Sequence, residues 1–578
     1  MESGAEILVK CLESEGVEVI FGYPGGAALE IFDALQKSKQ IRNILVRHEQ
    51  GAAHAANGYA RVSGKVGVCL ATSGPGATNL ITGVATAYMD SIPMVIITGQ
   101  VPSGMVGTDA FQEVDITGIS DPISKHNYLV KDTKDLPRIV KEAFYIAKSG
   151  RPGPVLIDIP KDVAASLVEY KEYSRVDLRG YKPNLTGHKG QVKQVVQLIT
   201  KAQRPLFCAG GGVISAQAEK ELLFLAEKLQ APVVSTMMGL GSIPQEHPLS
   251  LGMLGTYGLA RANQATQACD LFIALGMRFD DRVTGNTQKF APQAKIIHID
   301  IDTAEIGKNV RADVPLVGDL KIILKQIMEC LDCSKKEAWW PEVEAEVARQ
   351  QANEKANENK NKKGKAKEQA GGRELADEVH PAEVITALNQ VLSSEAIITT
   401  DVGQHQIWAA QGLNLQKPRT FISSGGLGTM GYGIPAAVGA QVAFPQRPVV
   451  VITGDGSFQM GMPELGTCLE EDLPLKIIIF NNRTLGMVKQ LQDHYCEGRH
   501  VSVSFRKQPE FQYIARAYGA LGLCVQKKAE LSEKLAQLMR HPGLAVLEIV
   551  FAAEHNVYPM VLAGKGLDEM VSEVCVVR

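Results

Sequence analysis

Two apolar runs at the spacing of a strand-helix-strand crossover constrain the fold of this chain more than any other feature. Residues 449–454 (VVVITG) and 475–480 (LKIIIF) have the composition of buried strands, and a helix-compatible segment separates them. Asp455 follows the first run and Asn482 follows the second, at the separation of about 30 residues that such a crossover needs. The spacing therefore predicts two parallel strands whose carboxyl ends bring Asp455 and Asn482 to one edge of a sheet.

That edge is where open parallel sheets bind ligands, and glycines at 454 and 456 would let the backbone approach a phosphate closely. A carboxylate and an amide oxygen suit Mg²⁺, which commonly keeps a diphosphate as a further partner. Each motif alone also has an ordinary explanation, a turn for Gly-Asp-Gly and a helix N-cap for Asn-Asn. Their occurrence together favours a site for magnesium and a diphosphate.

The length and charge of the chain limit the remaining possibilities. With 578 residues the chain is too long for one core, so two to four domains are expected. The net charge of −3, without a dense basic stripe, argues against nucleic acid and anionic membranes as partners. No apolar run reaches the roughly 18 residues of a membrane span, and residues 1–10 lack a signal-peptide layout. We therefore expect a cytoplasmic protein, or an organellar one such as a protein of the plastid stroma.

Alternation of strand-like and helical segments occurs three times and predicts an α/β fold of three open, mainly parallel-sheet domains. The predicted domains are 1–167, 190–343 and 374–578, the last with a C-terminal tail. Between them, 344–373 is rich in Lys, Glu, Asn and Gln and nearly devoid of large apolar residues, which predicts a polar linker. Cys330 and Cys333 form a lone CxxC without a second pair or a nearby His, so we expect reduced thiols and no zinc site.

Four further segments could take part in binding or catalysis, although ordinary structural roles could explain them as well. Glu49 ends a strand-like run and opens an Ala-rich helix, where it could face a ligand or simply interact with the helix dipole. The turns at 22–30 (GYPGGAALE) and 72–79 (TSGPGATN) could admit a ligand or serve only as turns. A GxGxxG-like spacing within 423–440 lacks the layout of a nicotinamide dinucleotide site.

Taken in order, the segment RHEQGAAHAANGYAR around Glu49, the turn TSGPGATN, and Gly-Asp-Gly followed by Asn-Asn resemble the thiamine-diphosphate enzymes of the pyruvate-oxidase and acetolactate-synthase group. The resemblance covers nearly all of the chain except the linker. Within the group, 106–130, 277–285 and 425–437 (GGLGTMGYGIPAA) resemble the FAD-containing acetolactate synthases, also called acetohydroxyacid synthases. The three domains would then bind the pyrimidine, FAD and the diphosphate in turn.

The resemblance implies a role for each candidate site residue. Asp455, Asn482 and the backbone carbonyl of Thr484 would ligate Mg²⁺, and Glu49 would hydrogen-bond the pyrimidine ring and so promote deprotonation of the cofactor. Met430 would hold the cofactor in a bent shape. Besides Glu49, the residues implied around thiamine diphosphate are Gln404, His405, Gly428, Met430, Gly454, Asp455, Gly456, Ser457, Asn482 and Met487.

The implied reaction is decarboxylation of pyruvate on thiamine diphosphate and condensation of the resulting hydroxyethyl enamine with a second 2-oxo acid. Pyruvate would give 2-acetolactate and 2-oxobutyrate would give 2-aceto-2-hydroxybutyrate, at the first common step of branched-chain amino-acid biosynthesis, toward isoleucine and valine. Gln112 would act at the reacting carbons, and Phe111, Lys161, Arg282 and Leu491 would contact substrate. FAD would have no redox role, because the reaction involves no net redox change. Its implied contacts are Arg151, Gly210, Gly211, Gly212, Gly255, Arg278, Asp300 and Asp319.

One position departs from the pattern of these synthases. The chain reads MVKQL, with Leu491 where the family usually has Trp. That Trp lines the acceptor and inhibitor region, so we predict weakened inhibition by compounds that stack there and leave the preference between 2-oxobutyrate and pyruvate open.

The resemblance also implies a homodimer or a dimer of dimers whose sites are shared between chains, with a possible regulatory small subunit. Pyruvate oxidase, the FAD-free catabolic acetolactate synthase and a sulfoacetaldehyde-type acetyltransferase are the nearest alternatives, and the segments DAFQE and RFDDRVTG argue against them. Glyoxylate carboligase lacks the glutamate that is present here at Glu49. A catalytically silent paralogue serving as a binding subunit is a further alternative, which the presence of Glu49, Asp455 and Asn482 disfavours.

Overall fold

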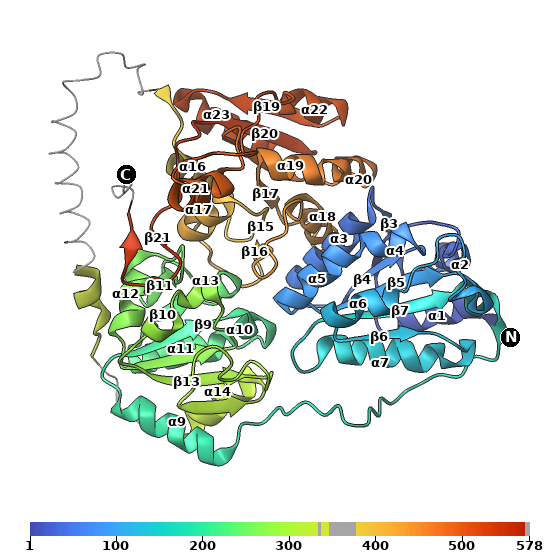
Figure 1. Cartoon of the computed structure of the whole chain (residues 1–578), viewed down its shortest axis with the longest axis horizontal. Helices are drawn as coiled ribbons and strands as arrows, with labels where there is room; N and C mark the ends of the chain where they lie inside the picture. The colour runs from blue at the N-terminus through green and yellow to red at the C-terminus, as the bar shows by residue number, and fades with distance from the viewer. Residues whose placement is uncertain (333–336, 346–348, 350–376, 573–578) are drawn as a thin grey trace.

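A computed structural model describes residues 1–332, 337–345, 349 and 377–572 (Figure 1). Within these ranges the chain forms three α/β units, each built on a six-stranded parallel sheet with helices against its faces. The predicted fold class is confirmed. The predicted linker lies outside the described residues, except for residues 344, 345 and 349. Cys333 also lies outside them. The domain boundaries stay a prediction. None of the described helices is long and apolar enough to cross a membrane.

The N-terminal sheet has two cores, one on each face. Helices α3 (Glu49–Ser63) and α5 (Ile81–Asp90) pack on one face, and α1 (Gly4–Ser14), α2 (Leu29–Lys37) and α7 (Leu136–Lys148) pack on the other. The strands, in their order across the sheet, are β3 (Arg42–Leu45), β2 (Val19–Tyr23), β4 (Gly67–Ala71), β5 (Met94–Gln100), β7 (Pro154–Pro160) and β6 (His126–Leu129).

The central sheet also receives the end of the described chain. Its strands, in order, are β11 (Ser250–Met253), β10 (Val233–Ser235), β9 (Pro205–Ala209), β12 (Leu271–Leu275), β13 (Lys295–Asp300) and β14 (Val314–Val317). Helices α9 (Lys189–Lys201), α11 (Glu219–Leu229), α12 (Ala260–Ala268) and α14 (Leu320–Cys330) cover it. Strands β21 (Met560–Val561) and β22 (Met570–Val571) form a small antiparallel pair, and Val561 and Leu567 are buried in the central core. This part of the chain thus packs against the second domain, whereas the sequence pattern predicts that it belongs with the third.

The third sheet contains the predicted crossover. Strand β17 (Val449–Gly454) pairs in parallel with β18 (Lys476–Asn481), and Gly454 lies opposite Phe480. The full order is β16 (Phe421–Ile422), β15 (Ile397–Thr400), β17, β18, β20 (Ala545–Val550) and β19 (Leu521–Val525). Its helices are α16 (Pro381–Val391), α17 (Gln404–Gly412), α18 (Gly433–Ala443), α19 (Asp455–Gly461), α20 (Leu465–Glu470), α21 (Gly486–Tyr495), α22 (Phe511–Ala517) and α23 (Leu531–Arg540).

Helices α3 and α18 join the first and third domains into one core. Their backbones approach so closely that a Cβ at Gly58 would lie 2.1 Å from the carbonyl oxygen of Ala436. A Cβ at Gly439 would lie 1.8 Å from the carbonyl oxygen of Ala55. Any larger residue would force the helices apart, so these two glycines set the spacing between the domains.

Candidate functional site

The crossover places the predicted metal ligands at adjacent strand ends, as its spacing required. Asp455 begins α19 directly after β17, and Asn482 directly follows β18. Both line one cavity at the carboxyl edge of the third sheet. Nearly all of the residues predicted around the metal and diphosphate line the same cavity: Gln404, His405, Met430, Gly454, Asp455, Gly456, Ser457, Asn482, Thr484 and Met487. Gly428 instead lines a second, larger cavity.

Burial makes the Asp455 carboxylate an unfavourable place for an uncompensated charge. The residue is 2% exposed, and burial raises the pKa of its carboxyl to about 6 despite a hydrogen bond donated by the Gln508 amide. A divalent cation would relieve this cost by pairing with the ionised carboxylate. Sequence reasoning missed Gln508, because a loop residue 53 positions from Asp455 gives no local signal.

Other polar atoms in this cavity have no hydrogen-bond partner within the described residues. They are Nε2 of His405 and Oγ1 of Thr484, both buried. Burial lowers the pKa of His405 to about 3, so its ring is neutral at ordinary pH. Asn482 accepts a hydrogen bond from the backbone N–H of Thr484 (3.1 Å) and donates one to Gln404 (3.2 Å). Unsatisfied donors beside a buried carboxylate fit an anionic, oxygen-rich ligand bound together with a cation.

Aromatic side chains complete the wall of this cavity. Trp408 and Phe551 both line it, and neither was predicted. Trp408 lies one helical turn after Gln404 on α17, so the i, i+4 relation to a predicted site residue was the available signal.

Glu49 lies in a different cluster. The His48 side chain caps α3 by accepting from the Gln50 N–H (3.1 Å), which fixes Glu49 as the first residue of the helix. One Glu49 carboxylate oxygen accepts from the Asn79 amide (2.9 Å) in the turn 72–79. A Cβ at Gly74 in that turn would lie 2.9 Å from the carbonyl oxygen of Gln112, so the turn and the 111–112 segment are in contact.

This second cluster is open to solvent in the single chain. Phe111 is 88% exposed, and Gln112 has a positive φ of 61°. Glu49, Phe111 and Gln112 are absent from the described residues that line the Asp455 cavity. Lys161, at the start of α8 (Lys161–Ala165), lines neither cavity and lies 3.9 Å from Glu30 in an ion pair. One chain therefore presents two separate clusters of predicted site residues.

Glu464 links the two clusters within the chain. It ends the short helix η7 (Met462–Glu464) that follows α19, and its buried carboxylate accepts from the Arg47 N–H (3.1 Å) and the Thr467 hydroxyl (2.6 Å). Burial raises the pKa of this carboxyl. Glu464 thus holds the backbone that leads into Glu49, a contact across more than 400 positions that the sequence does not indicate.

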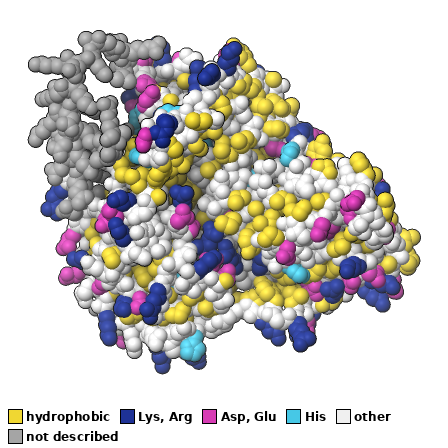
Figure 2. All heavy atoms as spheres, viewed as in Figure 1, with side chains coloured by type: hydrophobic (Ala, Val, Ile, Leu, Met, Phe, Trp, Pro, Cys, Tyr) yellow, Lys and Arg dark blue, Asp and Glu magenta, His cyan; other side chains and the backbone are white. Residues whose placement is uncertain are grey.

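The larger cavity has a volume of about 1020 Å³ and lies where the three domains meet. Figure 2 shows Lys and Arg side chains gathered near the centre of the face of the molecule that is turned toward the viewer. Several residues predicted for FAD or substrate line it: Arg151, Gly211, Gly212, Arg278, Arg282, Asp300, Asp319 and Leu491. The volume and the arginines fit a dinucleotide with a diphosphate.

Gly210 and Gly255, which were predicted for FAD, are not on this wall among the described residues. A Cβ at either position would lie 2.2 Å from a carbonyl oxygen, that of Gly276 or Arg282, so both glycines permit close backbone packing. Asp319 also has a structural role, because it caps α14 by accepting from the Ile322 N–H (3.0 Å).

Charge is balanced around the larger cavity. Arg151 pairs with Glu305 (2.9 Å) and Asp302 (3.2 Å), and burial raises the pKa of Asp300 to about 6. Arg419 donates hydrogen bonds to the carbonyl oxygens of Arg61 and Ile214, and burial lowers the pKa of its guanidinium. Sequence reasoning missed this residue. A carboxylate-lined edge beside arginines would bind hydroxyls and a diphosphate of one ligand.

Comparisons with known proteins match all three domains. The models of the thiamine pyrophosphate enzymes match as the N-terminal TPP binding domain at 2–119, the central domain at 192–327 and the C-terminal TPP binding domain at 401–549. The chain is 45% identical to the acetolactate synthase isozyme 3 large subunit of Escherichia coli, over 99% of this chain and 98% of that protein. It is 47% identical to a probable acetolactate synthase large subunit of Methanocaldococcus jannaschii, over 99% and 95% of the two chains. The acetolactate synthase large subunit of Haemophilus influenzae is 44% identical over 98% of both chains.

Proposed function

We propose that this chain, which belongs to the thiamine pyrophosphate enzyme family, is the catalytic subunit of an acetolactate synthase. Within the family it belongs to the acetolactate synthase large subunits. It would convert two pyruvate molecules to 2-acetolactate and CO₂, or pyruvate and 2-oxobutyrate to 2-aceto-2-hydroxybutyrate and CO₂. The supporting observation is the cavity that holds Asp455 and Asn482 together with buried polar atoms of His405 and Thr484, which have no hydrogen-bond partner in the described part of the chain.

Thiamine diphosphate, when bound, supplies an acidic carbon and a sink for the electrons released by decarboxylation. The chain's task is to hold the cofactor and exclude water. Asp455, the side-chain oxygen of Asn482 and the backbone carbonyl of Thr484 would hold Mg²⁺, and His405 would donate to the diphosphate through Nε2. Gln404, already bonded to Asn482, would orient that ligand.

Glu49 would hold a proton in a hydrogen bond to the pyrimidine ring. The Asn79 amide occupies one of its carboxylate oxygens and fixes the orientation of the other. Because Glu49 is not on the wall of the Asp455 cavity, we infer that the site is completed by Glu49 of a second chain. Exposure of Phe111 beside Gln112 supports a contact there that a single chain leaves open.

The larger cavity would hold FAD in a non-redox role, with Arg151 and Arg278 near its phosphates. Arg282 and Leu491 line the same cavity, as does Met487, which also lines the Asp455 cavity. From the wall of the larger cavity, the Arg282 guanidinium would bind the carboxylate of the acceptor 2-oxo acid beside the aliphatic side chain of Leu491. A regulatory small subunit would accompany the chain, as the relatives' designation as large subunits suggests, and a cytoplasmic location stays a prediction.

Product analysis tests this function. The purified chain is incubated with thiamine diphosphate, Mg²⁺, FAD and pyruvate, with and without 2-oxobutyrate, and the products are identified by mass spectrometry. We expect acetolactate without peroxide, and the mixed product when 2-oxobutyrate is present. Acetyl phosphate or peroxide would assign the chain to the oxidases instead. Absence of any product, even with the small subunit of a relative added, would favour a catalytically silent subunit.

A further inference from the structure

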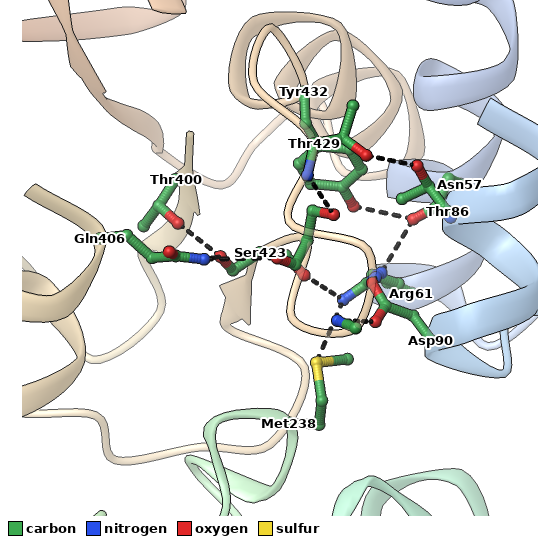
Figure 3. Close-up of polar contacts among 12 residues, drawn as sticks. Asn57, Arg61, Thr86, Asp90, Met238, Thr400, Gln406, Ser423, Thr429 and Tyr432 are labelled. Atoms are coloured by element: carbon green, nitrogen blue, oxygen red, sulfur yellow. Dashed lines mark hydrogen bonds and ion pairs between the residues drawn. The ribbon is translucent and has the colours of Figure 1, made fainter. Parts of the chain in front are cut away.

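A buried ion pair marks the point where all three domains meet. Arg61 lies on α3 with its side chain 6% exposed, and Asp90 ends α5 with its side chain fully buried. Figure 3 shows the Arg61 guanidinium between Asp90, the loop after β16 and Met238 of the central domain. The guanidinium donates to Asp90, to the carbonyl oxygen of Ser423 (2.7 Å) and to Asn57 (2.8 Å). Met238 lies in the short helix η4 (Met237–Gly239), with its sulfur 4.0 Å from the guanidinium.

Helix α5 contacts the loop 423–429 at two further points. The second carboxylate oxygen of Asp90 accepts from the Gly426 N–H (2.7 Å). The hydroxyls of Thr86 and Thr429 are 2.8 Å apart, which places another contact from α5 at the far end of the loop (Figure 3). The N-terminal domain therefore holds the start, the middle and the end of this loop.

The third domain contacts the start of the loop through Thr400 and Gln406. The hydroxyl of Ser423 is 2.7 Å from that of Thr400, and it accepts from the Gln406 amide at 2.7 Å. Gln406 belongs to α17, the helix that also places Gln404 and His405 in the Asp455 cavity, where the diphosphate is proposed to bind and which is called the diphosphate cavity below. The central domain closes the remaining side, because a Cβ at Gly425 would lie 2.5 Å from the Met238 sulfur.

The loop lines the larger cavity and leads directly to Met430 in the smaller one. Its residues 423–428 line the larger cavity, together with Arg61 and Asp90, whereas Met430 lines the diphosphate cavity. Glycines at 425, 426 and 428 give the loop little conformational preference of its own. Its shape must therefore come from the side chains that hold it.

An ion pair of this kind is poorly explained as a contribution to stability. Removing two charges from water costs about as much as their attraction returns, so buried pairs are better suited to specifying one arrangement. Here the arrangement specified is that of the loop relative to α3 and α5. Arg61 also contacts the ring of Tyr432, which follows Met430 by two positions, at 5.6 Å.

We propose that Arg61 and Asp90 are positioning residues that hold the 423–429 loop so that Met430 projects into the diphosphate cavity. Through this loop, occupancy of the larger cavity by a flavin dinucleotide tightens binding of thiamine diphosphate in the smaller one. The identities of the two ligands rest on the proposed function. By linkage the effect is reciprocal, so thiamine diphosphate tightens flavin binding by the same factor.

Calorimetric titration tests the coupling directly. The Kd of thiamine diphosphate with Mg²⁺ is measured for the full-length protein without FAD and saturated with FAD. We expect FAD to tighten wild-type binding about tenfold, within the usual range of coupling between sites. In Asp90→Asn, which removes the charge but keeps the shape, the factor should fall below about twofold. Equal coupling in the variant and the wild type, or none in the wild type, would overturn the proposal.

Two further variants keep the test decisive. Thr86→Val removes only the contact to Thr429, and it should reduce the coupling factor even if Asp90→Asn does not fold. Glu142→Gln is the matched control, because Glu142 is a buried partner of Arg138 in the same domain, away from the loop, and should leave the factor unchanged. A loss of coupling in the control as large as in Asp90→Asn would also overturn the proposal. Acetolactate formation with normal Kd values but no coupling would refute this inference alone, whereas absence of thiamine diphosphate binding would refute the proposed function as well.

Discussion

Asp158 gives the sharpest quantitative prediction, because its carboxyl is buried within the N-terminal domain. The residue is 1% exposed on β7 and accepts from the Thr98 hydroxyl (2.7 Å) and the Gln100 amide (2.9 Å). Burial raises the pKa of its carboxyl from 3.8 to about 7, and the charge of Asp115 acts in the same direction. That gap corresponds to about 4 kcal/mol, at about 1.4 kcal/mol for each pH unit.

The sign follows from proton linkage. Between pH 3.8 and about 7 the folded state binds more protons at this site than the unfolded state, so stability falls as the pH rises through this window. The destabilisation is complete above about pH 7, and by pH 5 it has fallen to less than half of that value. Asn has the shape of the protonated acid and can donate to the Thr98 hydroxyl while accepting from the Gln100 amide.

We therefore expect Asp158→Asn to stabilise the protein at pH 8 by up to about 4 kcal/mol, with the advantage shrinking steadily toward pH 5. The assay is the thermal unfolding midpoint of both proteins from pH 5 to 8.5 in matched buffers. Asp33→Asn is the control, since its side chain is 72% exposed and the difference from wild type should not follow this profile. A difference that is constant with pH, or a destabilised variant at pH 8, would refute the reasoning.

The remaining predictions concern the site and the domain interface. Glu49→Gln should lower turnover by about 10² to 10⁴-fold while leaving folding and calorimetric binding of thiamine diphosphate intact, and near-normal turnover would remove Glu49 from its assigned role. Gly439→Ala should lower the free energy of unfolding by about 1–3 kcal/mol and lower the melting midpoint, because its Cβ would lie 1.8 Å from the Ala55 carbonyl oxygen. Gly26→Ala is the control, because its Cβ would meet no atom within 4 Å, and it should leave the melting midpoint unchanged. Equal melting midpoints for the two variants would contradict the packing explanation. Leu491→Trp should strengthen inhibition by stacking aromatic compounds up to about tenfold in inhibition assays, as an aromatic pair is worth about 0.5–1.5 kcal/mol. Strong inhibition of the wild type that the substitution does not increase would contradict it.

Sequence reasoning placed the residues predicted for the metal and the diphosphate at one sheet edge, because strand pairing leaves little freedom. Once β17 and β18 are parallel neighbours, Asp455 and Asn482 must share an edge, whatever the rest of the chain does. The motif pattern around Gln404 and Met430 extended this to the other side chains of the cavity.

Contacts between distant segments could not be predicted in the same way. Glu464 meets the backbone of Arg47, and Arg61 meets Ser423, across several hundred positions and with no repeated pattern to mark them. Glycine motifs are ambiguous in another way, since a glycine that lets a ligand approach and one that lets a backbone approach look alike in sequence. Gly210 and Gly255 both permit a close backbone approach, and their contact with FAD stays a prediction.

The most direct test of the central claim is complementation between two inactive variants. Glu49→Gln and Asp455→Ala are co-expressed with different affinity tags, the mixed species is purified through both tags, and acetolactate formation is measured. If each site combines Glu49 of one chain with Asp455 of another, the mixed species has one intact site and forms acetolactate although neither variant does so alone. Absence of product from the mixed species would contradict a shared thiamine diphosphate site built from these residues.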